Sequence, residues 1–106
     1  KYSLNGVGSY GKGRLALEII RVYVKSNPVN YNELVNLLPK HLIKTVEEVN
    51  KWKSQTSDTH KRWFEKDILI SNDGVTFVVS SQHGKDNISR IFELANKFGY
   101  EIKEIK

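Results

Sequence analysis

The sequence predicts an α+β domain, because apolar residues recur at a helical period through residues 14–53 and give way to short β-branched runs after residue 66. The length of 106 residues fits one domain built on one hydrophobic core. The expected order is three helices, a β-hairpin, a fourth helix and a final strand. Residues 1–13 contain four glycines and are predicted to form a flexible surface arm, and residues 14–106 form the domain.

The first helix is expected over residues 14–26. Its polar side chains recur at steps of three or four residues, and the rest of its circumference is apolar, which is typical of a helix at the centre of a core. Asn30, with a glutamate three residues later, forms a capping-box pattern that predicts the start of a second helix. Thr45 and Glu48 form the same pattern and predict a short third helix over 45–53.

Two β-branched runs, residues 68–70 and 75–79, are predicted to form the hairpin. Asp73-Gly74 lies between them and supplies the positive φ angle that a tight turn requires.

After the hairpin, the fourth helix is expected to begin at the cap residue Asp86 and to end at Gly99, with residues 100–105 as the final strand. This part of the chain is close to neutral, because residues 67–106 carry five Lys and Arg against six Asp and Glu. Its helix and its strand edge motivate an alternative function, in which the chain is a protein-protein interaction module.

Three helices followed by a hairpin resemble the winged-helix form of the helix-turn-helix domain over residues 14–80. The resemblance implies that the third helix enters the major groove of DNA and that the hairpin touches the flanking phosphate backbone. Glu47 and Glu48 depart from this pattern, because they place acid on the helix that would meet DNA. The helix and strand after the hairpin are additions to the minimal module.

Positive charge is concentrated in the first two thirds of the chain. Residues 1–66 carry twelve Lys and Arg against six Asp and Glu, and the net charge of the whole chain is +5. Cations flank both Trp52 and Trp63, and this alternation favours a polyanionic partner.

We therefore expect a non-catalytic nucleic-acid-binding domain that binds DNA, as part of a bacterial-type regulator or as the targeting module of a larger protein. Cations would neutralise phosphates, and neighbouring amide side chains would read base edges. The candidate cations are Lys12, Arg14, Lys44, Lys51, Lys53, Lys61, Arg62 and Lys85, and the candidate amides are Asn50 and Gln55.

Other motifs lack the partners that catalysis or metal binding needs. The G-x-G-x-x-G pattern at 6–11 has no βαβ unit around it, the histidines at 41, 60 and 83 are scattered, and the chain contains no cysteine. Glu101-Ile102-Lys103 resembles half of a nuclease metal site, which needs a partner aspartate from an adjacent strand. Asp73 is expected in a turn, which leaves Asp67 as the candidate partner. An enzyme is therefore the third interpretation, and we expect no cofactor, no metal and no catalytic activity.

The apolar stretches are far shorter than the roughly 18 residues that a membrane span requires, and no leader pattern is present. We therefore expect a cytoplasmic domain without a membrane partner.

Overall fold

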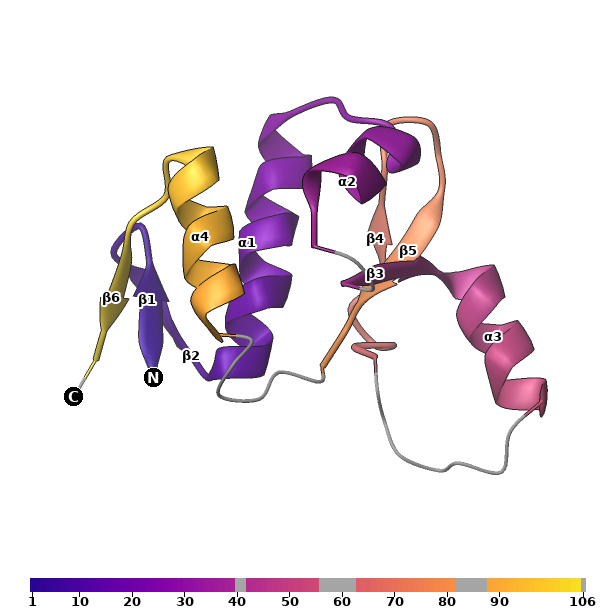
Figure 1. Cartoon of the computed structure of the whole chain (residues 1–106), viewed down its shortest axis with the longest axis horizontal. Coiled ribbons are helices and arrows are strands. Elements are labelled where there is room, and N and C mark those ends of the chain that lie inside the picture. Colours follow the sequence, from indigo (N-terminus) through magenta and orange to yellow (C-terminus); the bar gives the residue numbers. More distant parts are fainter. Residues whose placement is uncertain (40–41, 56–62, 82–87, 106) are drawn as a thin grey trace.

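Four helices and two antiparallel sheets make up the described part of the chain, which in this computed structural model is residues 1–39, 42–55, 63–81 and 88–105 (Figure 1). The elements in chain order are β1 (Tyr2–Leu4), β2 (Val7–Tyr10), α1 (Lys12–Ser26), α2 (Tyr31–Leu37), β3 (Ile43–Thr45), α3 (Val46–Gln55), β4 (Leu69–Ile70), β5 (Thr76–Val79), α4 (Ile88–Phe98) and β6 (Ile102–Glu104). The predicted α+β class is confirmed, but the predicted order omits β1, β2 and β3.

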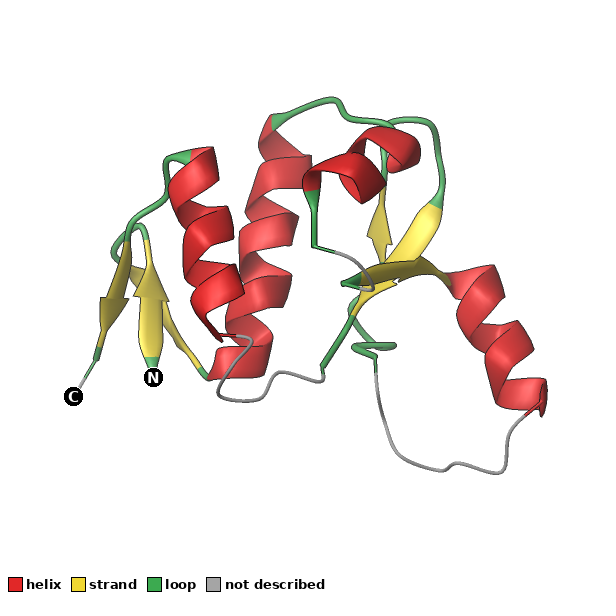
Figure 2. Ribbon diagram, viewed as in Figure 1, coloured by secondary structure: helices red, strands yellow, loops and turns green. Residues whose placement is uncertain are grey.

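The central helix of the fold is α1. It lies beside α4, and one sheet lies on either side of the helices (Figure 2). Residues 15–20 of α1 are all buried, so this helix is surrounded on every side over more than one turn. A single core cluster contains Leu4 from the first sheet and Phe77 from the second. The expectation of one core around a broad apolar helix is therefore correct.

The glycine-rich segment is part of a sheet, so its prediction as a flexible arm is corrected. Asn5 and Gly6 have φ angles of 53° and 78°, and they turn β1 back into β2. β1 also pairs with β6, which gives the sheet order β2-β1-β6. Leu4 is only 4% exposed. The glycines that suggested mobility include the one that makes this turn, and the partner strand lies about 100 residues away in the sequence.

The predicted hairpin is present in the second sheet, whose strand order is β3-β5-β4. Its strands are shorter than the β-branched runs, and Gly74 has the positive φ of 82° that the turn requires. Phe77 on the central strand β5 lies opposite Thr45 on one side and Leu69 on the other. Trp63 extends this sheet by an isolated bridge to Ser80.

The hairpin turn is bound to the start of α2. The backbone N–H of Asn72 donates to the carbonyl of Val29 at 2.8 Å, and the backbone N–H of Tyr31 donates to Asp73 Oδ1 at 3.1 Å. Asn30 makes no side-chain capping bond, so the capping box predicted there is wrong. Asp73, which lies 42 residues after Tyr31, provides an acceptor for this helix start instead.

Two other predicted helix ends can be compared with the structure. The capping box of Thr45 and Glu48 is confirmed, and Gly99 follows α4 with a φ of 77°. The cap predicted at Asp86 lies outside the described residues.

We expect the stabilisation by Asp73 to depend on pH. The hydroxyl of Ser71, with a further contribution from the backbone N–H of Tyr31, lowers the pKa of Asp73 below its ordinary value of 3.8. A carboxyl whose folded-state pKa is lowered contributes stability above its unfolded-state pKa, and this contribution is lost as the pH falls through the folded-state pKa. Asp73→Asn should therefore reduce the free energy of unfolding at neutral pH, as measured by urea unfolding.

The difference between the wild type and Asp73→Asn should shrink as the pH falls below 3.8. A difference that stays constant between about pH 7 and about pH 2.5 would contradict this role for the carboxylate.

Candidate nucleic-acid interface

The helix α3 starts at a closed capping box. The hydroxyl oxygen of Thr45 accepts a hydrogen bond from the backbone N–H of Glu48 at 3.1 Å, and Oε1 of Glu48 accepts from the Thr45 hydroxyl at 3.0 Å. The same carboxylate accepts from the backbone N–H of Thr45 at 3.4 Å. These bonds satisfy N–H groups that have no partner within the helix, so α3 begins directly where β3 ends.

Most of α3 lies free of the hydrophobic core. It is at the end of the molecule beyond β3, and Val49 is its only buried side chain (Figure 1). At 100° per residue, Glu47, Lys51 and Ser54 lie opposite Val49. Asn50 and Gln55 flank this face, and all of these polar residues are exposed. The helix therefore presents a polar face to any partner that approaches this end of the protein.

A cation and an indole meet beside the start of α3. Lys44 Nζ lies 5.8 Å from the centre of the Trp63 ring, and both side chains are half-buried. This distance is within the range of a cation–π interaction. The two residues come together because β3 and the bridge at Trp63 both pair with the strand that runs from β5 into Ser80. This pairing was not predicted, because Lys44 and Trp63 are far apart in the sequence.

Carboxylates engage two of the predicted cations. Lys53 forms an ion pair with Glu65. Arg14 lies 3.4 Å from Asp67 and 3.8 Å from Glu18. Of these two cations, Lys53 lies on α3, so the positive surface around α3 is smaller than its count of lysines suggests.

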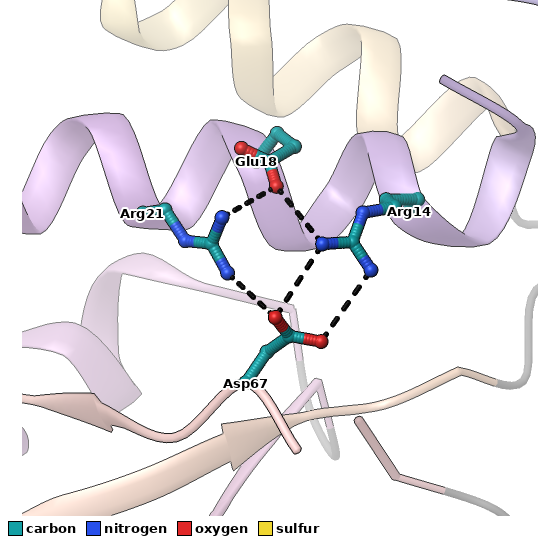
Figure 3. Close-up of polar contacts among 4 residues, drawn as sticks. All are labelled: Arg14, Glu18, Arg21 and Asp67. Atoms are coloured by element: carbon teal, nitrogen blue, oxygen red, sulfur yellow. Dashed lines mark hydrogen bonds and ion pairs between the residues drawn. The ribbon is translucent and has the colours of Figure 1, made fainter. Parts of the chain in front are cut away.

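Arg14 belongs to a cluster of two guanidinium groups and two carboxylates that joins α1 to the segment before β4 (Figure 3). Arg21 makes the shorter contacts in this cluster, at 2.8 Å to Glu18 and 3.0 Å to Asp67. The cluster, which we call the α1 ion-pair cluster, has no net charge. Its side chains serve to hold the fold together.

The structure brings together half of the predicted site. Five candidates lie on α3 or beside its start, and they are Lys44, Asn50, Lys51, Lys53 and Gln55. Lys12 and Arg14 lie in the first turn of α1, away from α3 (Figure 1). Lys61, Arg62 and Lys85 are outside the described residues, as are His41, His60 and His83. Sequence reasoning did not include Ser54, although its position in the helical repeat places it on the same face as Lys51.

A hollow of about 400 Å³ lies between α2 and α3. Its walls combine apolar groups such as Val35 and Ile43 with the polar groups of Tyr31, Lys44 and Glu48. Burial, and then the nearby carboxylate of Glu48, raise the pKa of Tyr31 above its usual value of 10.0. The phenol therefore remains a neutral hydrogen-bonding group at physiological pH. A lining that mixes apolar and polar groups can contact both the flat face and the polar edge of a planar aromatic ring.

The described residues include the pattern that resembles half of a nuclease site. Glu101 and Lys103 form an exposed ion pair with each other at 3.1 Å. In the described part of the chain, no three His, Asp or Glu side chains are grouped so that they could hold a metal ion. Nor does any helix among these residues have both the length and the apolar character needed to cross a membrane.

Comparisons of the chain with protein-family models, with curated proteins and with solved structures found no match. The candidate interface is therefore interpreted from its own geometry.

Proposed function

We propose that the chain is a non-catalytic nucleic-acid-binding domain that binds DNA, with α3 as the helix that contacts the bases. The observation that carries this proposal is the placement of α3. A capped helix whose only buried side chain is Val49 exposes Asn50, Lys51 and Gln55 at the end of the molecule. Helices that enter a major groove require such freedom from the protein core.

The arrangement of the neighbouring elements supports a winged-helix-like use of α3. Two helices, α1 and α2, precede it, and the hairpin of β4 and β5 follows it in a sheet with β3. The hairpin turn differs from a free wing, because Asn72 and Asp73 are bonded to residues 29–31. Contacts to the phosphate backbone would therefore come from the end of the sheet near Lys44 and Trp63.

The proposed mechanism divides the contacts into two kinds. Lys44 and Lys51 would neutralise phosphates and release counterions, which supplies affinity without sequence preference. Asn50 and Gln55 carry amides that can pair with base edges, above all with adenine. Glu47 lies on the same exposed face, and its carboxylate would repel phosphate. Binding would therefore require that the helix enter the groove deeply enough for this carboxylate to accept a hydrogen bond from the amino group of cytosine.

Lys51→Ala is expected to weaken binding to a random-sequence DNA duplex by about three- to tenfold, because one phosphate contact is lost. The affinity of the wild type should fall as the salt concentration rises, and the variant should show a slope of log K against log salt that is smaller by about 1. Fluorescence anisotropy at several salt concentrations measures both quantities. Single-stranded DNA in parallel reports whether the duplex is preferred.

Lys25→Ala is the matched control, because Lys25 is also an exposed lysine, lies in the last turn of α1 and is outside the candidate interface. It removes the same charge and should leave both the affinity and the slope close to wild type. Equal losses for Lys25→Ala and Lys51→Ala would indicate an effect of net charge and would overturn the role given to α3. No binding by the wild type at low salt would overturn the proposed function.

A further inference from the structure

The outer edge of β6 has no strand partner within the described part of the chain, because β6 is the last strand in the order β2-β1-β6. The backbone groups on that edge follow from the pairing with β1. Glu101 accepts from the N–H of Asn5 at 2.8 Å, and Ile105 donates to the carbonyl of Lys1 at 2.7 Å. In an antiparallel ladder the direction of the hydrogen bonds alternates. Ile102 and Glu104 therefore point their N–H and C=O groups away from β1, toward solvent.

One antiparallel pairing of β6 with a second copy of itself matches this alternation. With Ile102 on the two-fold axis, Ile102 faces its own copy and exchanges two hydrogen bonds with it. The N–H of Glu104 then faces the carbonyl of Tyr100 in the other copy. The N–H of Tyr100 is already used, because it donates to Ala95 at 2.8 Å, and the pairing does not require it.

The same register is complementary in charge. It places Glu101 of each copy directly opposite Lys103 of the other, on the face of the sheet away from α4. Both side chains are well exposed, at 65% and 71%, and they form an ion pair with each other within one copy at 3.1 Å. Exposed ion pairs are weak, so this contact can be exchanged for the pairs between copies. Opposite charges at directly facing positions stabilise an antiparallel pair, and like charges destabilise it.

Neighbouring registers lack this match. A two-fold axis at Lys103 would place lysine opposite lysine and would point the wrong backbone groups at each other. An axis at Glu104 would place glutamate opposite glutamate. A lone lysine on an edge strand normally prevents pairing between copies, whereas the spacing of Glu101 and Lys103 permits it in one register.

On the face of the sheet that lies toward α4, apolar surface is found next to the outer edge of β6. A groove of about 380 Å³ lies there, lined by Tyr2, Phe92, Tyr100 and Ile102 among others. Phe92 is 38% exposed. A second Ile102 placed against the first would cover part of this groove, so backbone bonds, ion pairs and apolar burial all favour the same arrangement.

We propose that β6 is a self-association edge, through which two copies of the chain pair antiparallel about Ile102 into a continuous six-stranded sheet. This inference is independent of the proposed nucleic-acid binding, because it uses the opposite end of the molecule and its test contains no nucleic acid.

The test is a charge exchange followed by sedimentation equilibrium across the micromolar range. The wild type should show a reversible monomer–dimer equilibrium. Glu101→Lys and Lys103→Glu each turn both facing pairs into like-charge pairs, so each should raise the dimer dissociation constant by about tenfold. The double variant restores opposite charges across the seam and should dimerise as the wild type does. An equimolar mixture of the two single variants should form the mixed dimer, because all facing positions are then complementary.

Thermal unfolding at concentrations below the dimer dissociation constant provides the control for folding, because self-association would itself raise the midpoint. There the midpoints should agree, because both side chains are exposed. A wild type that stays monomeric throughout the concentration range overturns the proposal. So does a single variant that dimerises as strongly as the wild type, or a mixture of the single variants that forms no mixed dimer.

Discussion

Replacing Phe77 by alanine is expected to lower the free energy of unfolding by about 3–5 kcal/mol. The ring is completely buried on the central strand β5, and its centre lies 5.7 Å from that of Tyr31. Its removal would leave a cavity where the second sheet meets the core, and the strands on both sides of β5 limit how far the site can collapse. Small domains have a total stability of about 5–15 kcal/mol, so this loss is a large part of the whole.

Phe92→Ala is the matched control for this experiment. It deletes the same side chain from a position that is 38% exposed and that packs edge-on against Tyr2 at 5.5 Å. We expect a loss of about 1–2 kcal/mol, because less apolar surface returns to water. Urea or thermal unfolding, followed by circular dichroism, compares the two variants. Losses of equal size would contradict the central place of Phe77 in the core.

Arg21→Leu is expected to lower the free energy of unfolding by about 2–3 kcal/mol, between the values for exposed and for fully buried ion pairs. Arg21 lies between the carboxylates of Glu18 and Asp67, whose side chains are 10% and 24% exposed. Without the guanidinium, two negative charges remain close together in a partly desolvated site, and Arg14 offsets them from longer distances. Equilibrium unfolding in urea measures the loss.

Arg14→Leu is the matched control for Arg21→Leu, because it removes the other guanidinium of the α1 ion-pair cluster. Its side chain is 45% exposed, and its contacts are 3.4 Å and 3.8 Å long, so we expect a loss of less than about 1 kcal/mol. Combining Arg21→Leu with Asp67→Asn should cost less than the sum of the single changes, because each removes the same interaction. Additive losses would show that the two side chains do not act together.

Signals that act within one turn or helix were visible in the sequence. Thr45 and Glu48 are three residues apart, and they form the predicted capping box because both partners belong to the same helical turn. Gly74 and Gly99 have the predicted positive φ angles, because only glycine adopts this conformation at little cost. The apolar face of α1 is equally local, since it follows from helical periodicity.

Interactions between distant segments could not be read in the same way. The three strands that were missed are three or four residues long, and β1 depends on β6 at the other end of the chain. The cap expected from Asn30 looked as sound as that of Thr45. Asn30 makes no such bond, and the first N–H of the helix, that of Tyr31, donates to Asp73. Only the folded hairpin brings that carboxylate there.

The candidate site shows the same difference between local patterns and contacts of distant segments. Exposure of Asn50, Lys51 and Gln55 follows from the narrow apolar stripe of α3, of which only Val49 is buried, and the sequence predicted these residues together. The cations can be counted in the sequence, but the sequence does not show which of them form ion pairs with carboxylates. Lys53 and Arg14 are engaged by Glu65 and Asp67, and these pairs form only when the segment before β4 folds back on the helices.

α3 and β6 lie at opposite ends of the longest dimension of the protein, which measures 40 Å (Figure 1). Under both proposals, copies joined at β6 would carry their α3 helices at the two outer tips. The helices would then be much farther apart than the roughly 34 Å that separates adjacent half-sites on one duplex. Such a dimer would suit the tethering of two remote DNA segments. Once one α3 helix is bound to DNA, the other α3 helix would be held at a raised local concentration near other DNA segments.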